Sequence, residues 1–391
     1  MSAPLVDRVR NRLVADRVDA TAPAVARALR AEGIVLGDSA VLDLVGELRR
    51  DLVGAGVLQP LLDDPAVTDV LVNRADDVWV DAGRGLVRTD IRFRDDDDVR
   101  RLAQRLAAVV GRRLDDATPF VDARLADGTR LHAVIPPIAA DGTTISLRVP
   151  RQRAFTLDHL VELGSIDSLG LRWLQAIVDA RLAFLISGGT GSGKTTVLSA
   201  LLGCAAVEER LVLIEDSLEL RPDHPHVVRL QARTANVEGA GAVTLRDLVR
   251  QSLRMRPDRV VVGEVRGAEV VDLLAALNTG HEGGCGTVHA NSARDVPARL
   301  EALGLTAGLD RAALHALVHA GIDVVIHLTR DRSGHRRVEG LHVLERAANG
   351  LVTTRCAFAG TAGGFTAGPA AGVLADRVRS AGVTPPLDES R

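Results

Sequence analysis

A glycine-rich stretch from Gly188 to Thr196, GGTGSGKTT, holds the residues of this chain that are best suited to chemistry. It fits the pattern G-x-x-x-x-G-K-[ST], in which backbone N–H groups wrap a triphosphate, the lysine reaches the β- and γ-phosphates, and the next hydroxyl binds Mg²⁺. The apolar segment LAFLIS precedes it and the helical segment TTVLSALLGC follows it, which is the context that the pattern needs. The sequence therefore predicts a site for ATP and Mg²⁺, whose binding residues are Gly188, Gly189, Thr190, Gly191, Ser192, Gly193, Lys194, Thr195 and Thr196.

Lys194 is the only lysine in the chain, so arginine supplies all the others of its 48 basic residues. The two side chains are not equivalent at a site that needs a compact point charge, because the guanidinium is planar and wide. We therefore expect Lys194 to occupy a place inside the loop that arginine does not fit.

Two segments place carboxylates where hydrolysis needs them, near the metal and the attacking water. RLVLIEDSLEL has Glu215, Asp216 and Glu219 after an apolar strand, and RPDRVVVGEVRG has Glu264 after another. Ligands bind beyond the carboxyl ends of parallel strands, which favours a catalytic role for Glu215 and Glu264. The alternative is that these acids cap helices or pair with nearby arginines. In the second segment, Gly263 stands where an aspartate is common.

Two histidines, His281 and His289, flank a glycine-rich strand in the segment TGHEGGCGTVHAN. They are eight residues apart with no Cys or Asp in ligand register, which does not favour a zinc site. A better use of a histidine at a strand end is to face the γ-phosphate, and His289 has that position.

The composition argues against a surface that binds nucleic acid. The formal net charge is −3, aromatic residues make up 2% and tyrosine is absent, so a basic patch with stacking rings is poorly supported. Cys204, Cys285 and Cys356 lie far apart, which predicts free thiols. The N-terminus has no apolar signal region and no apolar run is long enough for a bilayer. We therefore expect a cytoplasmic protein that meets the membrane through partners.

The first part of the chain predicts helices followed by an α+β domain. Residues 1–57 have apolar side chains at spacings of three and four, which is typical of helices. Residues 58–150 combine alternating strands with one helix that begins at the acidic run Asp95 to Asp98. We interpret that run as a helix start rather than a metal site, because negative charge is favourable there.

Residues 157–360, after a linker at 151–156, alternate short apolar strands with helices and predict an α/β domain whose parallel sheet is covered by helices. The predicted strands are LAFLIS, RLVLIED, RVVVGEV, CGTVHAN and DVVIHLT, and RRVEGLHVL and LVTTRCAF are expected to close the domain as a hairpin. Residues 361–391 are rich in Ala, Gly and Pro, so we expect a loosely ordered tail.

Four blocks together resemble the secretion ATPase superfamily of type II and type IV secretion and type IV pilus systems. GGTGSGKTT, IEDSLEL, RMRPDRVVVGEVRG and TGHEGGCGTVHAN are similar, in this order, to its Walker A, Asp box, Walker B and His box. The phrases VTDVLVN, DDVWV, VDARLADGTR and LRMRPDR are most similar to the CpaF/TadA branch, the tight-adherence pilus ATPases. The resemblance covers about residues 55–350.

The resemblance implies a RecA-like P-loop NTPase domain preceded by a smaller α+β, PAS-like domain and an N-terminal helical segment. It also implies a homo-hexamer that binds ATP between the two domains. By position, Glu215 resembles the Asp-box acid, Glu264 the Walker B glutamate and general base, and His289 the His-box residue near the γ-phosphate. The implied Mg²⁺ contacts are Thr195 directly, and Glu215 and Glu264 through water.

In this family, arginines of the N-terminal domain approach the phosphates and stabilise charge. Arg130 and Arg148 fall in the matching segments, GTRLHAVIPP and SLRVP, and Arg124 is a weaker candidate. The tetracysteine metal module of some members is absent, so the resemblance implies no zinc. The implied catalytic set is Glu264, Glu215, His289, Lys194, Arg130 and Arg148.

These features predict an ATP-hydrolysing hexameric motor that powers assembly or secretion of a Tad/Flp-type pilus, a type IV pilus. Its expected place is the cytoplasmic face of the membrane, on inner-membrane platform proteins and without direct contact to nucleic acid. Three alternatives stay open: a type IV secretion or conjugal-transfer ATPase that moves protein or DNA, a RecA-like helicase, and a scaffold that binds nucleotide without turnover.

Overall fold

The computed structural model divides into two compact units, Met1–Gln152 and Arg153–Arg391, and each has its own core. The division falls inside the segment 151–156, where the sequence predicts a linker. Most of the region 1–57, predicted to be helical, lies outside the described residues; the described part includes α2 (Ala22–Ala31). The structure describes residues 8, 9, 12, 21–34, 37, 40, 41, 54–83, 85–149, 155–233, 241–280, 282–331, 333–361 and 363–386.

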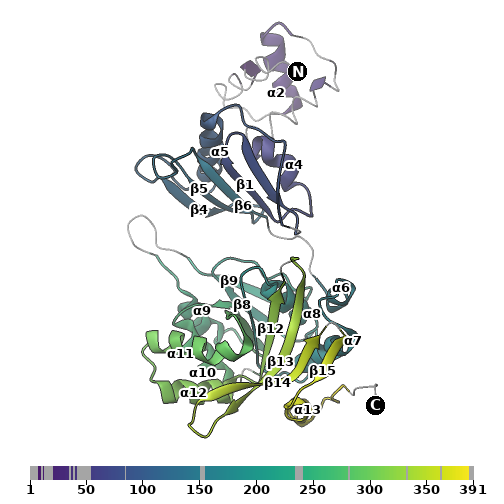
Figure 1. Ribbon diagram of the computed structural model, residues 1–391. Coiled ribbons are helices and arrows are strands. Elements are labelled where there is room, and N and C mark those ends of the chain that lie inside the picture. The colour runs from purple at the N-terminus through teal and green to yellow at the C-terminus, as the bar shows by residue number, and fades with distance from the viewer. Residues whose placement is uncertain are drawn as a thin grey trace. The chain divides into compact units, whose positions relative to one another are not determined.

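An antiparallel six-stranded sheet forms the centre of the N-terminal unit, in the order β3-β2-β1-β6-β5-β4 (Figure 1). Its strands are β1 (Asp69–Arg74), β2 (Asp77–Asp81), β3 (Leu86–Arg88), β4 (Phe120–Arg124), β5 (Arg130–Val134) and β6 (Thr144–Arg148). Besides α2, the described part of this unit has η1 (Gly56–Leu58), α4 (Gln59–Leu62) and α5 (Asp96–Val109). The apolar side chains of α5 are buried against alternate residues of the strands, so this sheet has one packed face.

The acidic run before α5 starts the helix, as predicted. Asp95 is the N-cap residue, and its carboxylate accepts the backbone N–H of Asp98 at 2.8 Å. The next three acids lie in the first turn, where unpaired N–H groups and the helix dipole favour negative charge.

A nine-stranded mixed sheet runs through the second unit, in the order β15-β14-β13-β12-β7-β11-β10-β8-β9. The strands from β12 to β9 in this order are parallel, and β13, β14 and β15 extend the sheet as antiparallel strands. The bounds are β7 (Phe184–Gly188), β8 (Leu211–Glu215), β9 (Val227–Gln231), β10 (Arg259–Val265), β11 (Cys285–His289), β12 (Val324–Arg330), β13 (Arg336–Arg346), β14 (Val352–Thr361) and β15 (Gly364–Ala367). The seven predicted strands are all present, whereas β9 and β15 were not predicted.

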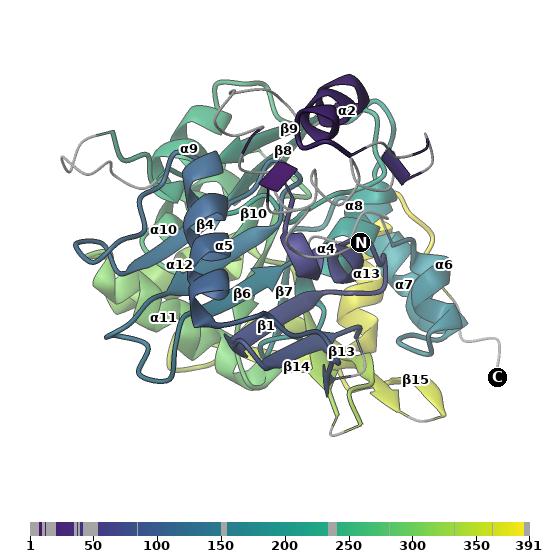
Figure 2. The same ribbon diagram turned by 90° about the horizontal axis from the view of Figure 1, so that it is seen from above.

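Helices cover both faces of this sheet and form two separate cores (Figures 1 and 2). On one face lie α6 (Leu157–Glu162), α7 (Ser168–Asp179), α8 (Lys194–Gly203) and α13 (Ala371–Ser380). On the other face lie α9 (Leu245–Ser252), α10 (Glu269–Leu277), η2 (Ala293–Asp295), α11 (Val296–Thr306) and α12 (Arg311–Gly321). This layering brings the carboxyl ends of the parallel strands to one edge, where ligands bind in such folds.

The expectation of a loosely ordered tail at 361–391 was wrong for most of that segment. β15 extends the sheet, and α13 buries Leu374 and Val378 completely against its face. Small residues there serve close packing, because a Cβ on Gly368 would lie 2.7 Å from the carbonyl oxygen of Cys356. The high content of Ala and Gly therefore reflects close contact rather than disorder.

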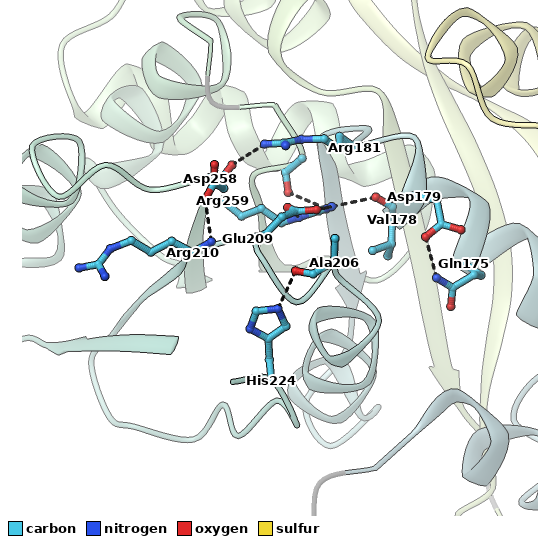
Figure 3. Close-up of polar contacts among 11 residues, drawn as sticks. Gln175, Val178, Asp179, Arg181, Ala206, Glu209, Arg210, His224, Asp258 and Arg259 are labelled. Carbon is cyan, nitrogen blue, oxygen red and sulfur yellow. Dashed lines mark hydrogen bonds and ion pairs between the residues drawn. The ribbon is translucent and has the colours of Figure 1, made fainter. Parts of the chain in front are cut away.

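A buried ion pair lies at the amino ends of the parallel strands, at the opposite edge from their carboxyl ends (Figure 3). Arg259, the first residue of β10, is 1% exposed and donates from Nε to Oε2 of Glu209 at 2.6 Å and from Nη2 to its Oε1 at 3.0 Å. The same Nη2 donates to the carbonyl of Val178 at 2.8 Å. The Arg259 side chain thus connects the end of α7 with the loop before β8 at the amino end of β10.

The three cysteines Cys204, Cys285 and Cys356 are free, as expected, and burial raises the pKa of Cys285 to about 12.

In the described part of the chain, no helix combines the length and the apolar character needed to cross a membrane.

Candidate nucleotide site

The glycine-rich loop joins β7 to α8, which confirms the predicted strand–loop–helix context. β7 ends at Gly188 and α8 begins at Lys194. A Cβ on Gly188 would lie 2.5 Å from the carbonyl oxygen of Leu328 on β12, so this position has room for glycine alone. Gly191 and Gly193 have φ values of +71° and +96°, which other residues rarely adopt. These backbone needs shape the loop into a cradle of N–H groups.

Lys194 lies inside this cradle. Its Nζ donates to the carbonyl oxygens of Gly188 and Gly189, both at 3.0 Å. Burial lowers the pKa of Lys194, and the nearby carboxylate of Glu264 opposes that shift. Ser192 Oγ is buried in the loop without a hydrogen-bond partner among the described residues. The loop thus holds one cation and one unsatisfied hydroxyl.

Glu215 is the last residue of β8 and is 3% exposed. Its Oε1 accepts the backbone N–H groups of Glu219 and Leu220, at 2.8 and 2.9 Å. Its Oε2 is buried and has no hydrogen-bond partner among the residues described. Burial raises the pKa of Glu215 to about 7, although the two backbone donors act in the opposite direction. One oxygen is therefore anchored, and the other is available to a ligand.

The Walker B segment holds Gly263 and Glu264 near the end of β10. Thr287 Oγ1, on the neighbouring strand β11, donates to the carbonyl oxygen of Gly263 at 2.6 Å. The half-buried Glu264 pairs with Arg266, whose Nη1 also lies 3.9 Å from Oδ2 of Asp216. The alternative of pairing with nearby arginines is thus realised for Glu264 and Asp216.

A buried carboxylate that the sequence analysis missed shapes the turn after Glu264. Oε1 of Glu269 accepts the backbone N–H groups of Arg266 and Gly267, at 2.6 and 2.7 Å. Glu269 is 6% exposed and belongs to the first turn of α10. Its position three residues after Arg266 is the only local signal for this role.

His289 ends β11 and lies directly opposite Gly188 in the parallel pairing of β11 with β7. This register places the predicted His-box residue beside the start of the phosphate loop. His281 lies outside the described residues. Within the described ranges, no three His, Cys, Asp or Glu side chains gather in a way that would hold a metal by themselves.

A histidine that the sequence analysis did not consider, His327 on β12, contacts the strand that leads into the loop. Its Nδ1 lies 2.8 Å from Oγ of Ser187, and its Nε2 lies 3.5 Å from Oε2 of Glu339. Burial lowers the pKa of His327, and burial lowers the pKa of His342 on β13 to about 4. At neutral pH both rings are uncharged parts of the packing beside the loop.

Two arginines missed by the sequence analysis, Arg330 and Arg336, also lie at the loop. Nε of Arg336 donates to the carbonyl oxygen of Gly191 at 2.8 Å. Nη1 of Arg330 lies 3.3 Å from the place that a Cβ on Gly191 would take. Arginine is so common in this chain that no local pattern distinguishes these two.

The arginines predicted in the N-terminal unit form one row across its sheet. Arg124 on β4 lies opposite Arg130 on β5, which lies opposite Arg148 on β6. Residues opposite one another in antiparallel strands project from the same face. Asp122 accepts from Nε and Nη2 of Arg130, at 3.1 and 2.7 Å, and these bonds lower the pKa of Asp122. The three candidates thus belong together, on a different unit from the phosphate loop.

A family model described as type II/IV secretion system protein matches residues 51–366. The match spans the greater part of both units. The chain belongs to the type II/IV secretion system protein family. This confirms the predicted superfamily.

Relatives in this family resemble the chain over most of its length. Rv3659c of Mycobacterium tuberculosis (strain ATCC 25618 / H37Rv), provisionally named a conjugal transfer protein, is 58% identical over 319 residues, which are 80% of this chain and 91% of that protein. The type IV secretion system protein PtlH of Bordetella pertussis is 32% identical, covering 72% of this chain and 91% of its own. The conjugal transfer protein TrbB of Rhizobium radiobacter is 30% identical, with 72% and 85% covered.

Solved structures show the shared fold. The ATPase DotB of Legionella pneumophila has a TM-score of 0.51 at 17% identity, covering 83% of this chain and 85% of its own. The pilus retraction motor PilT, solved with bound ADP, also has a TM-score of 0.51, at 16% identity, with 83% and 86% covered. The predicted α/β fold, a RecA-like domain after a smaller N-terminal domain, is confirmed.

Proposed function

We propose that the protein hydrolyses Mg²⁺-ATP and acts as a motor of a type II/IV secretion or pilus machinery. The observation that carries this proposal is the meeting of four predicted motifs at the carboxyl ends of neighbouring strands. The loop with Lys194 follows β7, His289 ends β11, Glu264 lies near the end of β10, and Glu215 ends β8. Charged groups at this edge of a parallel sheet are typical of a ligand site.

The residues at this edge fit a magnesium ion that arrives with the nucleotide. Mg²⁺ prefers oxygen ligands and keeps several waters, so a hydroxyl and carboxylates that act through water suit it. Thr195 would hold the ion directly, and Glu215 and Glu264 would bind its waters. The buried Oε2 of Glu215 supports this assignment, because it has no partner among the described residues. The ion would supply positive charge to the phosphate oxygens.

Each side chain then has one task in hydrolysis. Lys194 exchanges the carbonyl oxygens of Gly188 and Gly189 for the β- and γ-phosphates, and the loop N–H groups hold the same phosphates. The carboxylate of Glu264 orients the attacking water and accepts its proton, while His289 contacts the γ-phosphate. Lys194 and His289 would thus lie where negative charge develops on the phosphate oxygens, and Glu264 would lie where the water loses its proton.

The arginine row would supply further positive charge to that transfer. Arg130 and Arg148 lie opposite one another and project from one face of this sheet, in the segments that match those of the family's phosphate-facing arginines. We assign Arg130 and Arg148 to the phosphates of ATP, which requires the two units to close on the nucleotide. Opening and closing of the units would convert hydrolysis into mechanical work.

The enzymatic proposal is tested by phosphate release from ATP and Mg²⁺ with the full-length protein. Lys194→Ala and Glu264→Gln should each reduce turnover by about 100-fold or more, as removal of charge-stabilising or proton-accepting groups does. Arg130→Ala and Arg148→Ala should slow turnover while nucleotide still binds. Glu345→Gln, in an exposed pair with Arg355, is the control and should have full activity. A Lys194→Ala variant that hydrolyses ATP at the wild-type rate would contradict the proposal.

For the machinery, we propose a homo-hexamer on platform proteins at the cytoplasmic face of the inner membrane. The four phrases similar to the tight-adherence branch support a Tad/Flp-type pilus, and the names of TrbB and PtlH support the alternative of conjugal transfer or type IV secretion. Deletion of the gene distinguishes them, because loss of surface pili supports the first and loss of DNA or protein transfer with intact pili supports the second.

A further inference from the structure

The short turn between β10 and α10 follows directly after Glu264, the general base proposed above. β10 ends at Val265 and α10 begins at Glu269, so residues 266–268 alone connect the strand to the helix. Side chains two positions apart in an extended chain project from the same face, and Glu264 and Arg266 form an ion pair there. Val265, between them, is buried in the core. The orientation of Glu264 therefore depends on how the turn is held.

Glu269 holds this turn by its backbone. Its Oε1 accepts the N–H groups of Arg266 and Gly267, at 2.6 and 2.7 Å, and a Cβ on Gly267 would lie 3.1 Å from its Oε2. Both N–H groups precede the N-cap residue, Ala268, so these bonds do not cap the helix itself. Glu269 is 6% exposed, and a buried carboxylate costs free energy unless its oxygens are satisfied. The carboxylate is thus committed to the turn.

Arg266, the first residue of the turn, connects two motifs of the candidate site. Its Nη2 donates to Oε2 of Glu264, and its Nη1 lies 3.9 Å from Oδ2 of Asp216. Asp216 directly follows β8, which pairs with β10 in the parallel sheet. Charge-assisted hydrogen bonds of a planar guanidinium have defined directions. The position of Arg266 therefore restricts where the carboxylate of Glu264 points.

We propose that Glu269 is a positioning residue for ATP hydrolysis, which acts through Arg266 on Glu264. Glu269 fixes the backbone at Arg266, and the guanidinium holds one oxygen of Glu264, which leaves the other oxygen for the attacking water. A catalytic group that moves by about 1 Å can lose about 100-fold in rate, so this support matters for turnover. The role rests on the proposed ATPase function and adds a residue that acts only through another side chain.

The test measures phosphate release by the full-length protein over a range of Mg²⁺-ATP concentrations. Glu269→Ala removes both bonds to the turn and should lower kcat by about tenfold. KM should stay within about twofold of wild type, because the phosphate loop between β7 and α8 keeps its own contacts with the nucleotide. Glu269→Gln keeps an oxygen acceptor in the same place and should retain kcat within about threefold. A residue that only stabilises the fold would not produce this separation of kcat from KM.

Arg266→Gln tests the next link between Glu269 and the base. It should also lower kcat by about tenfold with little change in KM. In the double variant with Glu269→Ala, kcat should be no lower than in the less active single variant, because both residues act through Glu264. Arg266 is exposed, so its substitution tests the proposal even if Glu269→Ala does not fold.

Asp247→Ala is the matched control. Asp247 is also an acid in the first turn of a helix, α9, and its Oδ2 accepts the backbone N–H of Thr244 at 3.0 Å. Its removal should lower the midpoint of thermal unfolding and leave kcat unchanged. A comparable loss of kcat in this control would overturn the proposal, because damage to any helix start would then be sufficient.

Three further results would overturn the positioning role and leave the ATPase proposal intact. They are wild-type kcat in Glu269→Ala or Arg266→Gln, equal kcat in the alanine and glutamine forms of Glu269, and losses that multiply in the double variant. A wild-type protein that releases no phosphate would overturn the ATPase proposal itself, and the positioning role with it.

Discussion

The Cγ atom of Glu215 occupies the space that a side chain on Gly263 would need. A Cβ built on Gly263 would lie 2.7 Å from that atom and 3.3 Å from Oε1, whereas non-bonded carbons are most stable about 3.5–4.0 Å apart. Glu215 ends β8 and Gly263 lies on the neighbouring strand β10. An aspartate at position 263 would therefore clash with the buried Glu215 side chain, which explains why glycine stands there.

Gly263→Ala should displace Glu215 and damage both stability and activity. Overpacking of this size costs about 1–3 kcal/mol, and a carboxylate moved by a fraction of an ångström should lower turnover by about tenfold or more. In a Glu215→Ala background the clashing Cγ is absent, so the same substitution should cost much less stability. Chemical denaturation of the wild type, the two single variants and the double variant measures the coupling free energy between the two residues. Additive effects would show that the two residues do not compete for space.

Burial of Glu215 should make the free energy of unfolding depend on pH. Its pKa is raised from 4.5 to about 7 in the folded protein, so between these values the folded chain holds a proton that the unfolded chain has lost. The free energy of unfolding therefore falls as the pH rises from 4.5 to 7. Glu215→Gln should remove this loss and be more stable than wild type at pH 8, by on the order of 3 kcal/mol.

The fluorescence of Trp173 can report this change in the second unit. The chain has two tryptophans, and Trp173 is buried there while Trp79 lies in the N-terminal unit. A Trp79→Phe background leaves Trp173 as the only such probe for denaturation at pH 5.5 and pH 8. Parallel pH profiles for the glutamate and the glutamine forms would argue against a raised pKa.

His342 should produce the opposite dependence over an overlapping pH range. Its pKa is lowered from 6.5 to about 4 by burial and by the charges of His327 and Arg294, so the unfolded chain binds a proton there that the folded chain does not. The free energy of unfolding then rises with pH through this range. The two groups oppose each other between pH 4.5 and 6.5. His342→Gln should therefore make the stability fall more steeply with pH, and an unchanged slope would contradict this.

Individual strands and the phosphate loop were predictable, because each depends on residues that are close together in the sequence. Short apolar runs identified β7, β8, β10, β11 and β12, and glycine spacing identified the loop that ends with Lys194. β9 was missed because VVRLQ mixes polar and apolar residues at the sheet's edge, where only part of each side chain is buried. The tail was missed because Ala and Gly indicate disorder by composition, although they also permit close packing.

Contacts between distant segments were not predictable from this sequence. The fit of Gly263 against Glu215 depends on the pairing of β8 with β10, which no local pattern encodes. The motif search found Glu264 but not the support from Glu269, since a single glutamate at a helix start is common. Arg330 and Arg336 were not singled out because arginine is so common in this chain, and their position beside the loop follows from the register of one hairpin.

The buried pair of Arg259 and Glu209 should be strongly required for stability. Arg259→Gln would leave Glu209 largely buried without its ion partner, which costs about 3–5 kcal/mol. The double variant Arg259→Met with Glu209→Gln removes both charges and should recover much of that loss. Glu345→Gln, in the exposed pair with Arg355, should cost at most about 1 kcal/mol. Equal effects at the buried and exposed pairs in urea denaturation would refute this assignment.

Lys194→Arg tests why the chain has one lysine. The Nζ of Lys194 fits between the carbonyl oxygens of Gly188 and Gly189, inside a loop that two arginines of the β12–β13 hairpin already line from outside. A guanidinium keeps the charge but is too wide for this place, and it cannot become a point charge between two phosphates. We expect nucleotide binding to weaken and ATP turnover to fall by about 100-fold, with stability within about 1 kcal/mol of wild type. Arg337→Lys, the reverse exchange on the exposed face of the hairpin, should leave turnover unchanged. If Lys194→Arg keeps most of the wild-type turnover, a positive charge alone is sufficient in the loop. The shape of the lysine side chain would then not explain why this position is not an arginine.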